Sequence, residues 1–60
     1  MGAKEEFLKV YANLPVPERA QIIAIIGDET YSWNTAHIEI SNNTKLGEQI
    51  LKKLRELEIL

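Results

Sequence analysis

The clearest pattern of hydrophobic and polar positions lies at the end of the chain. After Thr44, a candidate N-cap, apolar residues recur at helical spacing and charged residues fill the positions between them. The apolar positions are Leu46, Ile50, Leu51, Leu54 and Leu57. This pattern predicts an amphipathic helix with one apolar stripe. Gly47, in its first turn, is expected to weaken the helix by up to about 1 kcal/mol relative to alanine.

A second amphipathic pattern covers residues 3–14. Phe7, Leu8, Tyr11 and Leu14 fall at helical spacing among lysine and glutamate residues, which predicts a first helix over these positions. Pro15 is expected to end it, because the residue before a proline is disfavoured in the α conformation. Residues 14–17 are then expected to form a stiff connector.

Residues 18–33 allow two interpretations. A helix would place Pro17 at the first helical position and Gly27 just past the end. However, residues 22–26 include four isoleucines and show no helical period. A hairpin would place Gly27 and Asp28 in a two-residue turn, with strands over residues 21–26 and 29–32. We favour the hairpin and keep the helix as the alternative.

The hairpin prediction also fixes which residues face each other. The expected pairs are Ile26 with Glu29, Ile25 with Thr30, Ala24 with Tyr31, and Ile22 with Trp33. Side chains alternate between the two faces of a strand. The face that carries Tyr31 and Trp33 should therefore also carry Ile22, Ala24 and Ile26. Ile23 and Ile25 should point away from it.

The segment that follows the hairpin is also ambiguous. Ser32 is a plausible N-cap for a helix over residues 33–41, with Trp33, Ala36, His37 and Ile40 on one side. The same residues alternate in polarity, so a third strand is a second possibility. Residues 42–44 form a clear break before the last helix. The expected fold is α+β in one small domain over residues 1–60: a helix, a short β-hairpin and two C-terminal helices. The alternative is an all-α four-helix bundle.

Composition restricts the chemistry. The 60 residues include no cysteine and one histidine, so disulfides are excluded and a zinc site is not expected. The net charge of −2 argues against nucleic acid without excluding it. The longest apolar run has five residues, far below the 18 or more of a membrane span, and the N-terminus lacks a secretory pattern. We expect a cytoplasmic location and no membrane association.

Catalytic patterns are also sparse. The only nucleophile and base pairing available is Ser32 or Ser41 with His37, and Ser32 fits a helix cap better. The three glycines are scattered and form no phosphate-binding pattern. We therefore expect no enzymatic activity, no catalytic residue, no metal and no cofactor.

Two resemblances bear on function. Leu51-Lys52-Lys53-Leu54, Leu57 and Ile59-Leu60 match the pattern L-K-K-L-x-x-L-G followed by two apolar residues, which often ends a recognition helix. With this match, residues 35–60 resemble the helix-turn-helix half of winged-helix DNA-binding domains. Glu58 replaces the glycine of that pattern, and Asn42 replaces an apolar turn residue. The resemblance implies that Lys45, Glu48 and Gln49 would approach base edges and that Lys52 or Lys53 would contact phosphates.

The second resemblance covers residues 17–60. The hairpin turn, Tyr31-Ser32-Trp33, Thr44-x-x-Gly47 and Ile50-Leu51-x-x-Leu54 are similar to small proteins found chiefly in archaea, which have no assigned activity. This resemblance implies the hairpin and the two helices after it, and no function.

The sequence does not identify what the protein does. Its short length and wide apolar stripe favour a small non-enzymatic domain that binds itself or another protein. The candidate interaction surface consists of Ile23, Ile25, Leu51, Ile59 and Leu60. The alternative is a helix-turn-helix DNA-binding protein that uses Lys45, Gln49, Lys52 and Lys53.

Overall fold

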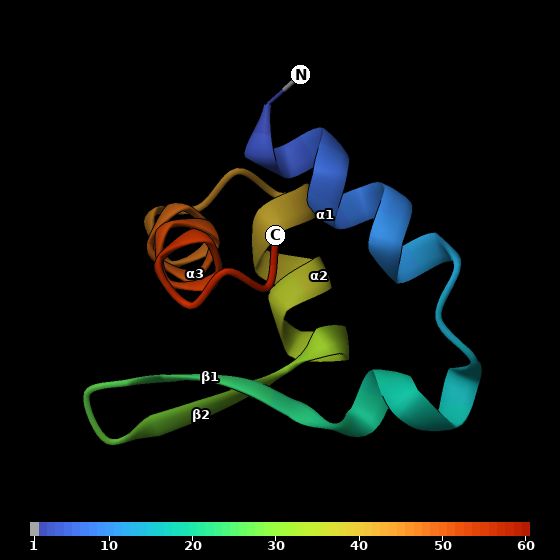
Figure 1. The fold of residues 1–60 in the computed structure, drawn as a ribbon. Helices are drawn as coiled ribbons and strands as arrows, with labels where there is room; N and C mark the ends of the chain where they lie inside the picture. The colour runs from blue at the N-terminus through green and yellow to red at the C-terminus, as the bar shows by residue number, and fades with distance from the viewer. Residues whose placement is uncertain (1) are drawn as a thin grey trace.

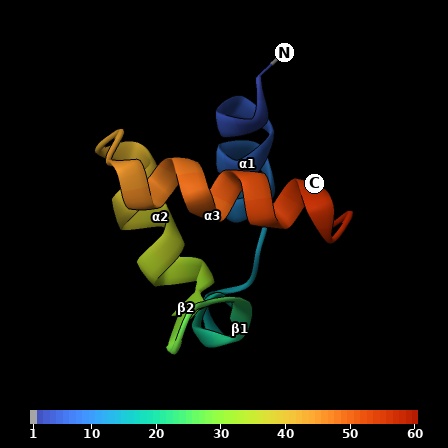
Figure 2. The same cartoon turned by 90° about the vertical axis from the view of Figure 1, so that its left-hand side faces the viewer.

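The structure is a computed structural model that describes residues 2–60, and it has the predicted α+β architecture (Figure 1). Its elements, in chain order, are α1 (Ala3–Ala12), the 3₁₀ helix η1 (Val16–Ala20), β1 (Ile22–Ile26), β2 (Glu29–Ser32), α2 (Trp33–Ser41) and α3 (Lys45–Glu56). Helix α2 stands at the centre, with the antiparallel hairpin at its N-terminal end, and α3 crosses in front of α1 and α2 in Figure 2. The all-α alternative is wrong.

Both predicted caps are present. The Ser32 hydroxyl accepts a hydrogen bond from the Thr35 amide at 3.2 Å, so the chain passes from β2 into α2 without a loop. The alternative of a third strand over residues 33–41 is therefore wrong. The Thr44 hydroxyl accepts from the Gly47 amide at 2.9 Å and donates to Glu39 Oε1 at 2.7 Å. This hydroxyl caps α3 and also ties it to α2.

The segment between α1 and β1 is more helical than we predicted from the sequence. Helix α1 ends at Ala12, two residues before the predicted end, and Leu14 lies beyond it. The Asn13 side-chain amide donates to the Lys9 carbonyl at 2.9 Å and so takes up a free acceptor of the last turn. A short 3₁₀ helix then begins at Val16, inside the segment that we expected to be a stiff connector.

The hairpin is confirmed, but its register is irregular near the open end. Ile26 pairs with Glu29, Ile25 with Thr30 and Ala24 with Tyr31, as predicted, whereas Ile22 pairs with Ser32 and not with Trp33. A shift between Ile22 and Ala24 inserts one extra residue into β1, and such a bulge re-aims the side chains beside it. Ile23 therefore packs against the core, and Ile22 is 55 % exposed. The predicted orientations of these two isoleucines are wrong.

The core lies where the helices meet the inner face of the hairpin. It consists of Phe7, Ala24, Trp33, Ala36, Ile40, Ile50 and Leu54. The Phe7 and Trp33 rings lie 5.5 Å apart, centroid to centroid, which joins α1 to the start of α2. Gly47 is also buried, and a Cβ atom there would lie 2.6 Å from the Glu39 carbonyl oxygen. Helices α2 and α3 can approach this closely only because residue 47 has no side chain.

Candidate functional site

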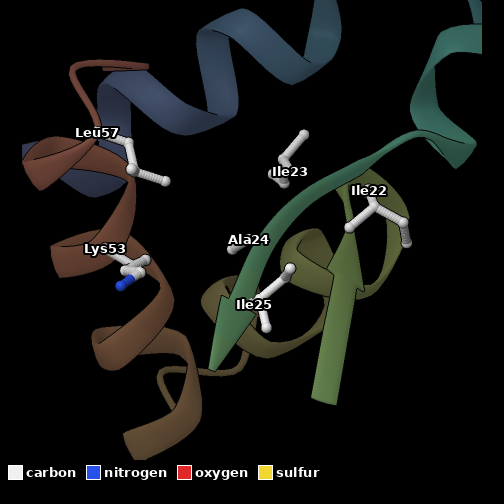
Figure 3. A pocket seen from close by; sticks show the side chains of 6 residues that line it. All are labelled: Ile22, Ile23, Ala24, Ile25, Lys53 and Leu57. Atoms are coloured by element: carbon white, nitrogen blue, oxygen red, sulfur yellow. The ribbon is translucent and has the colours of Figure 1, made fainter. Parts of the chain in front are cut away.

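A groove runs between β1 and the C-terminal half of α3. It is lined by four consecutive residues of β1, by one residue of α3 and by the C-cap residue of that helix, and its volume is about 380 Å³. The lining residues are Ile22, Ile23, Ala24, Ile25, Lys53 and Leu57. Figure 3 shows Leu57 extending toward β1 and Ile23 pointing into the gap, with Lys53 one helical turn before Leu57. This groove is a mainly apolar depression of the described surface.

The groove follows the free edge of β1. Consecutive strand residues point to opposite faces of a sheet, so a depression that touches four in a row lies along the edge of the strand. Strand β2 pairs with the other edge of β1 and contributes no residue to the groove lining given above. The two residues that flank a two-residue turn form backbone hydrogen bonds with each other, and here they are Ile26 and Glu29. Such pairs alternate along the ladder with pairs that form none, so Ile25 and Thr30 form no backbone hydrogen bond with each other. The backbone N–H and C=O of Ile25 therefore point outward from the hairpin.

The rim of the groove is apolar and exposed. Ile22 is 55 % exposed, Ile25 is 58 % exposed and Leu57 is 52 % exposed. Figure 3 shows Ile22 and Ile25 on the face of the hairpin opposite α2. Each isoleucine or leucine that becomes fully buried contributes about 1.5–3 kcal/mol. A segment laid along this edge could therefore gain apolar contacts and backbone hydrogen bonds together.

A second, smaller depression continues the groove toward the turn of the hairpin. It is about 280 Å³ in volume and is lined by Ile25, Ile26, Gly27, Gln49, Lys52, Lys53 and Glu56. Here the α3 side of the groove carries charged and amide groups. Lys53 lines both depressions. The continuous groove is thus apolar at the Ile22 end and mixed at the Gly27 end.

Only some residues of the interaction surface predicted from the sequence line the groove. Ile23 and Ile25 line the groove, although Ile23 is half-buried. Leu51 and Leu60 are half-buried, pack against the core and do not line the groove, and Ile59 is exposed beyond α3. The sequence reasoning missed Ile22, which the bulge exposes. It also missed Leu57, which we placed in the apolar stripe of the last helix and did not include in the interaction surface, but which lies exposed at the C-cap of α3.

The residues considered for catalysis have structural contacts. The Ser32 hydroxyl caps α2, and the His37 ring stacks on Tyr11 with centroids 4.1 Å apart. The Arg19 guanidinium lies 4.4 Å from the centroid of the same Tyr11 ring, and the Tyr11 hydroxyl donates to Asn34 Oδ1 at 2.7 Å. This cluster holds α1, η1 and α2 together. Within residues 2–60, no three histidine, aspartate or glutamate side chains are grouped as metal ligands.

The candidate DNA contacts lie on the exposed side of α3. Gln49, Lys52 and Lys53 border the turn end of the groove, whereas Lys45 lies at the start of the helix, away from it. Glu48 and Glu56 are each one helical turn from Lys52. Carboxylates at these positions reduce the positive potential that phosphates require.

Glu58 stands where the winged-helix pattern has a glycine, and its backbone conformation is unusual for a residue with a side chain. Glu58 adopts the left-handed conformation with φ 60°, and the amides of Glu58 and Ile59 donate to the carbonyls of Arg55 and Leu54. Glycine normally occupies this place after a helix. The chain therefore makes the helix end that the pattern implies, but with a residue that is strained there.

Comparison of the chain with protein-family models, with curated proteins and with solved structures finds no significant match. Among the helices of residues 2–60, none combines the length and the apolar character needed to cross a membrane.

Proposed function

We propose that this protein is a non-enzymatic protein-interaction domain that binds an extended polypeptide segment along the free edge of β1. The observation that carries the proposal is the coincidence of an unpaired strand edge with exposed Ile22, Ile25 and Leu57. A strand edge offers backbone hydrogen bonds, and the pockets beside it select alternate side chains of the bound segment.

The chemistry of the groove supports an extended apolar segment as the ligand. Each backbone hydrogen bond added to the edge contributes about 0.5–1.5 kcal/mol net. Leu57 of α3 overhangs the edge and can cover one face of an added strand (Figure 3). The ligand would thus be bound on its edge by β1 and on one face by α3.

Single-cysteine cross-linking tests the proposal, because the natural chain has no cysteine. We would place a photoreactive group on Ile25→Cys and, as a matched control, on Ile38→Cys. Ile38 is 57 % exposed against 58 % for Ile25, but it lies on α2 outside the groove. Each labelled protein would be irradiated at high concentration alone and in an extract of the source cells.

We expect protein adducts from position 25 and few or none from position 38. Adducts that disappear on nuclease treatment, equal labelling from both positions, or no adduct from position 25 would contradict the proposal.

The helix-turn-helix alternative makes the opposite prediction for nucleic acid. Because the protein is acidic and Lys52 is flanked by carboxylates, we expect no specific binding to mixed duplex DNA near physiological salt. A fluorescence titration measures this. Sub-micromolar, steeply salt-dependent binding that weakens in Lys52→Ala or Lys53→Ala would replace the proposed function by DNA binding.

A further inference from the structure

We infer that the segment bound along the free edge of β1 carries a carboxylate opposite Lys53, with an apolar residue on each side of it. This inference rests on the proposed function, and it names the class of ligand: an extended polypeptide segment with the order apolar, acidic, apolar. Two observations carry it. One is the environment of the Lys53 side chain, and the other is the different chemistry that the two faces of an added strand would meet.

Lys53 is a cation in mainly apolar surroundings. It lines both depressions, and among the described residues that line the apolar one it is the only charged side chain. It is half-buried, whereas Lys52 beside it is exposed. A strand laid along the edge would remove more water from Lys53, and a cation that loses water costs free energy unless an opposite charge replaces that water. A carboxylate on the ligand supplies that charge.

The protein itself supplies little compensating charge to Lys53. Its neighbours four residues before and after it are Gln49 and Leu57, both uncharged. Both such neighbours of Lys52 are glutamates. Glu56 lies three residues after Lys53, but it is exposed and lines only the depression at the turn, so water screens this pair. Strand β1 has no charged residue. The ammonium of Lys53 therefore remains available to a ligand.

The two faces of the hairpin place different chemistry beside an added strand. Ile22 and Ile25 are exposed on the face opposite α2 (Figure 3). Helix α3, which carries Lys53, lies on the same side of the hairpin as α2 (Figure 1). Successive side chains of a strand point to opposite faces. A ligand residue that points toward Lys53 is therefore flanked by residues that point toward the face of the exposed isoleucines, which gives the order apolar, acidic, apolar.

The ligand class is tested with a phage-displayed library of short random peptides, selected on the full chain. We expect the enriched peptides to carry aspartate or glutamate between two apolar residues. The affinity of synthetic copies is then measured by fluorescence anisotropy. Ile25→Lys should weaken binding about tenfold or more, because it places a charge on the edge of β1. Ile38→Lys changes a similarly exposed isoleucine of α2 and should leave binding unchanged.

Substitutions of the cation test the pairing itself. Lys53→Gln should weaken the acidic peptide about tenfold and should leave the affinity of the same peptide with its carboxylate replaced by an amide almost unchanged. Lys53→Glu should reverse the preference, so that a new selection enriches lysine or arginine at that place. Lys45→Glu is the matched control, because it makes the same change in net charge at the exposed start of α3, away from the groove. Circular dichroism checks that each variant is folded.

The outcomes separate the inference from the proposed function. Peptides that depend on residue 25 but show no preference for a carboxylate, or that bind Lys53→Gln as well as the parent, overturn the inference and leave the proposed function standing. An equal loss of binding in Lys45→Glu and Lys53→Glu also overturns it, because net charge would then explain the attraction. If no peptide is enriched, or if none depends on residue 25, the proposed function fails together with the inference.

Discussion

Helix α3 has two flanks that differ in almost every respect. On the flank that faces α2, Gly47, Ile50 and Leu54 are buried, and the glycine allows the two backbones to approach closely. On the flank that faces β1, Lys53 is half-buried, Leu57 is half exposed, and a groove separates the helix from the strand. The same stripe of apolar residues thus serves two purposes. Its centre holds the fold together, and its C-terminal margin borders the groove at which we propose that a polypeptide segment binds.

The largest expected effect tests the closed flank. Leu54 is fully buried in the core, so Leu54→Ala should lower the free energy of unfolding by about 2–5 kcal/mol. In a domain of this size that loss can unfold the protein at room temperature. Urea denaturation followed by circular dichroism measures it. A melting temperature within a degree or two of the parent would show that Leu54 does not contribute to the core.

The next effect reverses an expectation from helix propensity. Gly47→Ala would stabilise an isolated helix, by about 1 kcal/mol. Here the added Cβ would lie 2.6 Å from the Glu39 carbonyl oxygen and 3.0 Å from the Ile40 Cα, both on the backbone of α2. We expect a net loss of about 1–3 kcal/mol, because the helices must move apart. The same denaturation experiment decides the sign, and stabilisation would mean that the two helices are not in close contact.

The end of the open flank offers a change that should stabilise the protein. Glu58 holds a positive φ of 60°, where glycine is unstrained. Glu58→Gly should raise the free energy of unfolding by a few tenths to about 1 kcal/mol, less the entropy that glycine gains in the unfolded chain. Thermal unfolding measures the difference. Glu58→Ala is the control: it removes the carboxylate but keeps the strain, so it should not give the same increase.

The smallest effect is expected on the open flank itself. Leu57→Ala should change monomer stability by no more than about 0.5–1 kcal/mol at concentrations too low for self-association, because half of the side chain is already in water. A cost similar to that of Leu54→Ala would show that both flanks are core, and the distinction between them would be lost.

The sequence was most informative where a single residue dictates local geometry. Gly27 takes the positive φ that the two-residue turn needs, and Ser32 and Thr44 supply the hydroxyls that start α2 and α3. These signals are local, so the hairpin and both helix starts could be predicted. The bulge in β1 could not be predicted, because nothing in five consecutive isoleucine and alanine positions indicates where an extra residue is inserted.

The groove was only partly predictable for the same reason. Ile25 was assigned correctly to the outer face because its pairing follows from the turn. The exposure of Ile22 and the inward position of Ile23 depend on the bulge. Leu57 fits the helical stripe, but α3 ends at Glu56 and leaves it at the margin. The role of Gly47 depends on how close α2 lies, a tertiary contact that helix propensity does not contain.

The direct join between β2 and α2 also gives the protein a useful optical property. Its single tryptophan, Trp33, is the first residue after that join, is 8 % exposed and lies against Phe7. Indole emission should therefore be blue-shifted in the folded protein and should move to longer wavelength only when the whole assembly of helices and hairpin comes apart. Trp33 does not line the groove, so occupancy of that surface should leave the spectrum almost unchanged. Fluorescence can thus monitor the integrity of the fold in the same sample in which another method follows association.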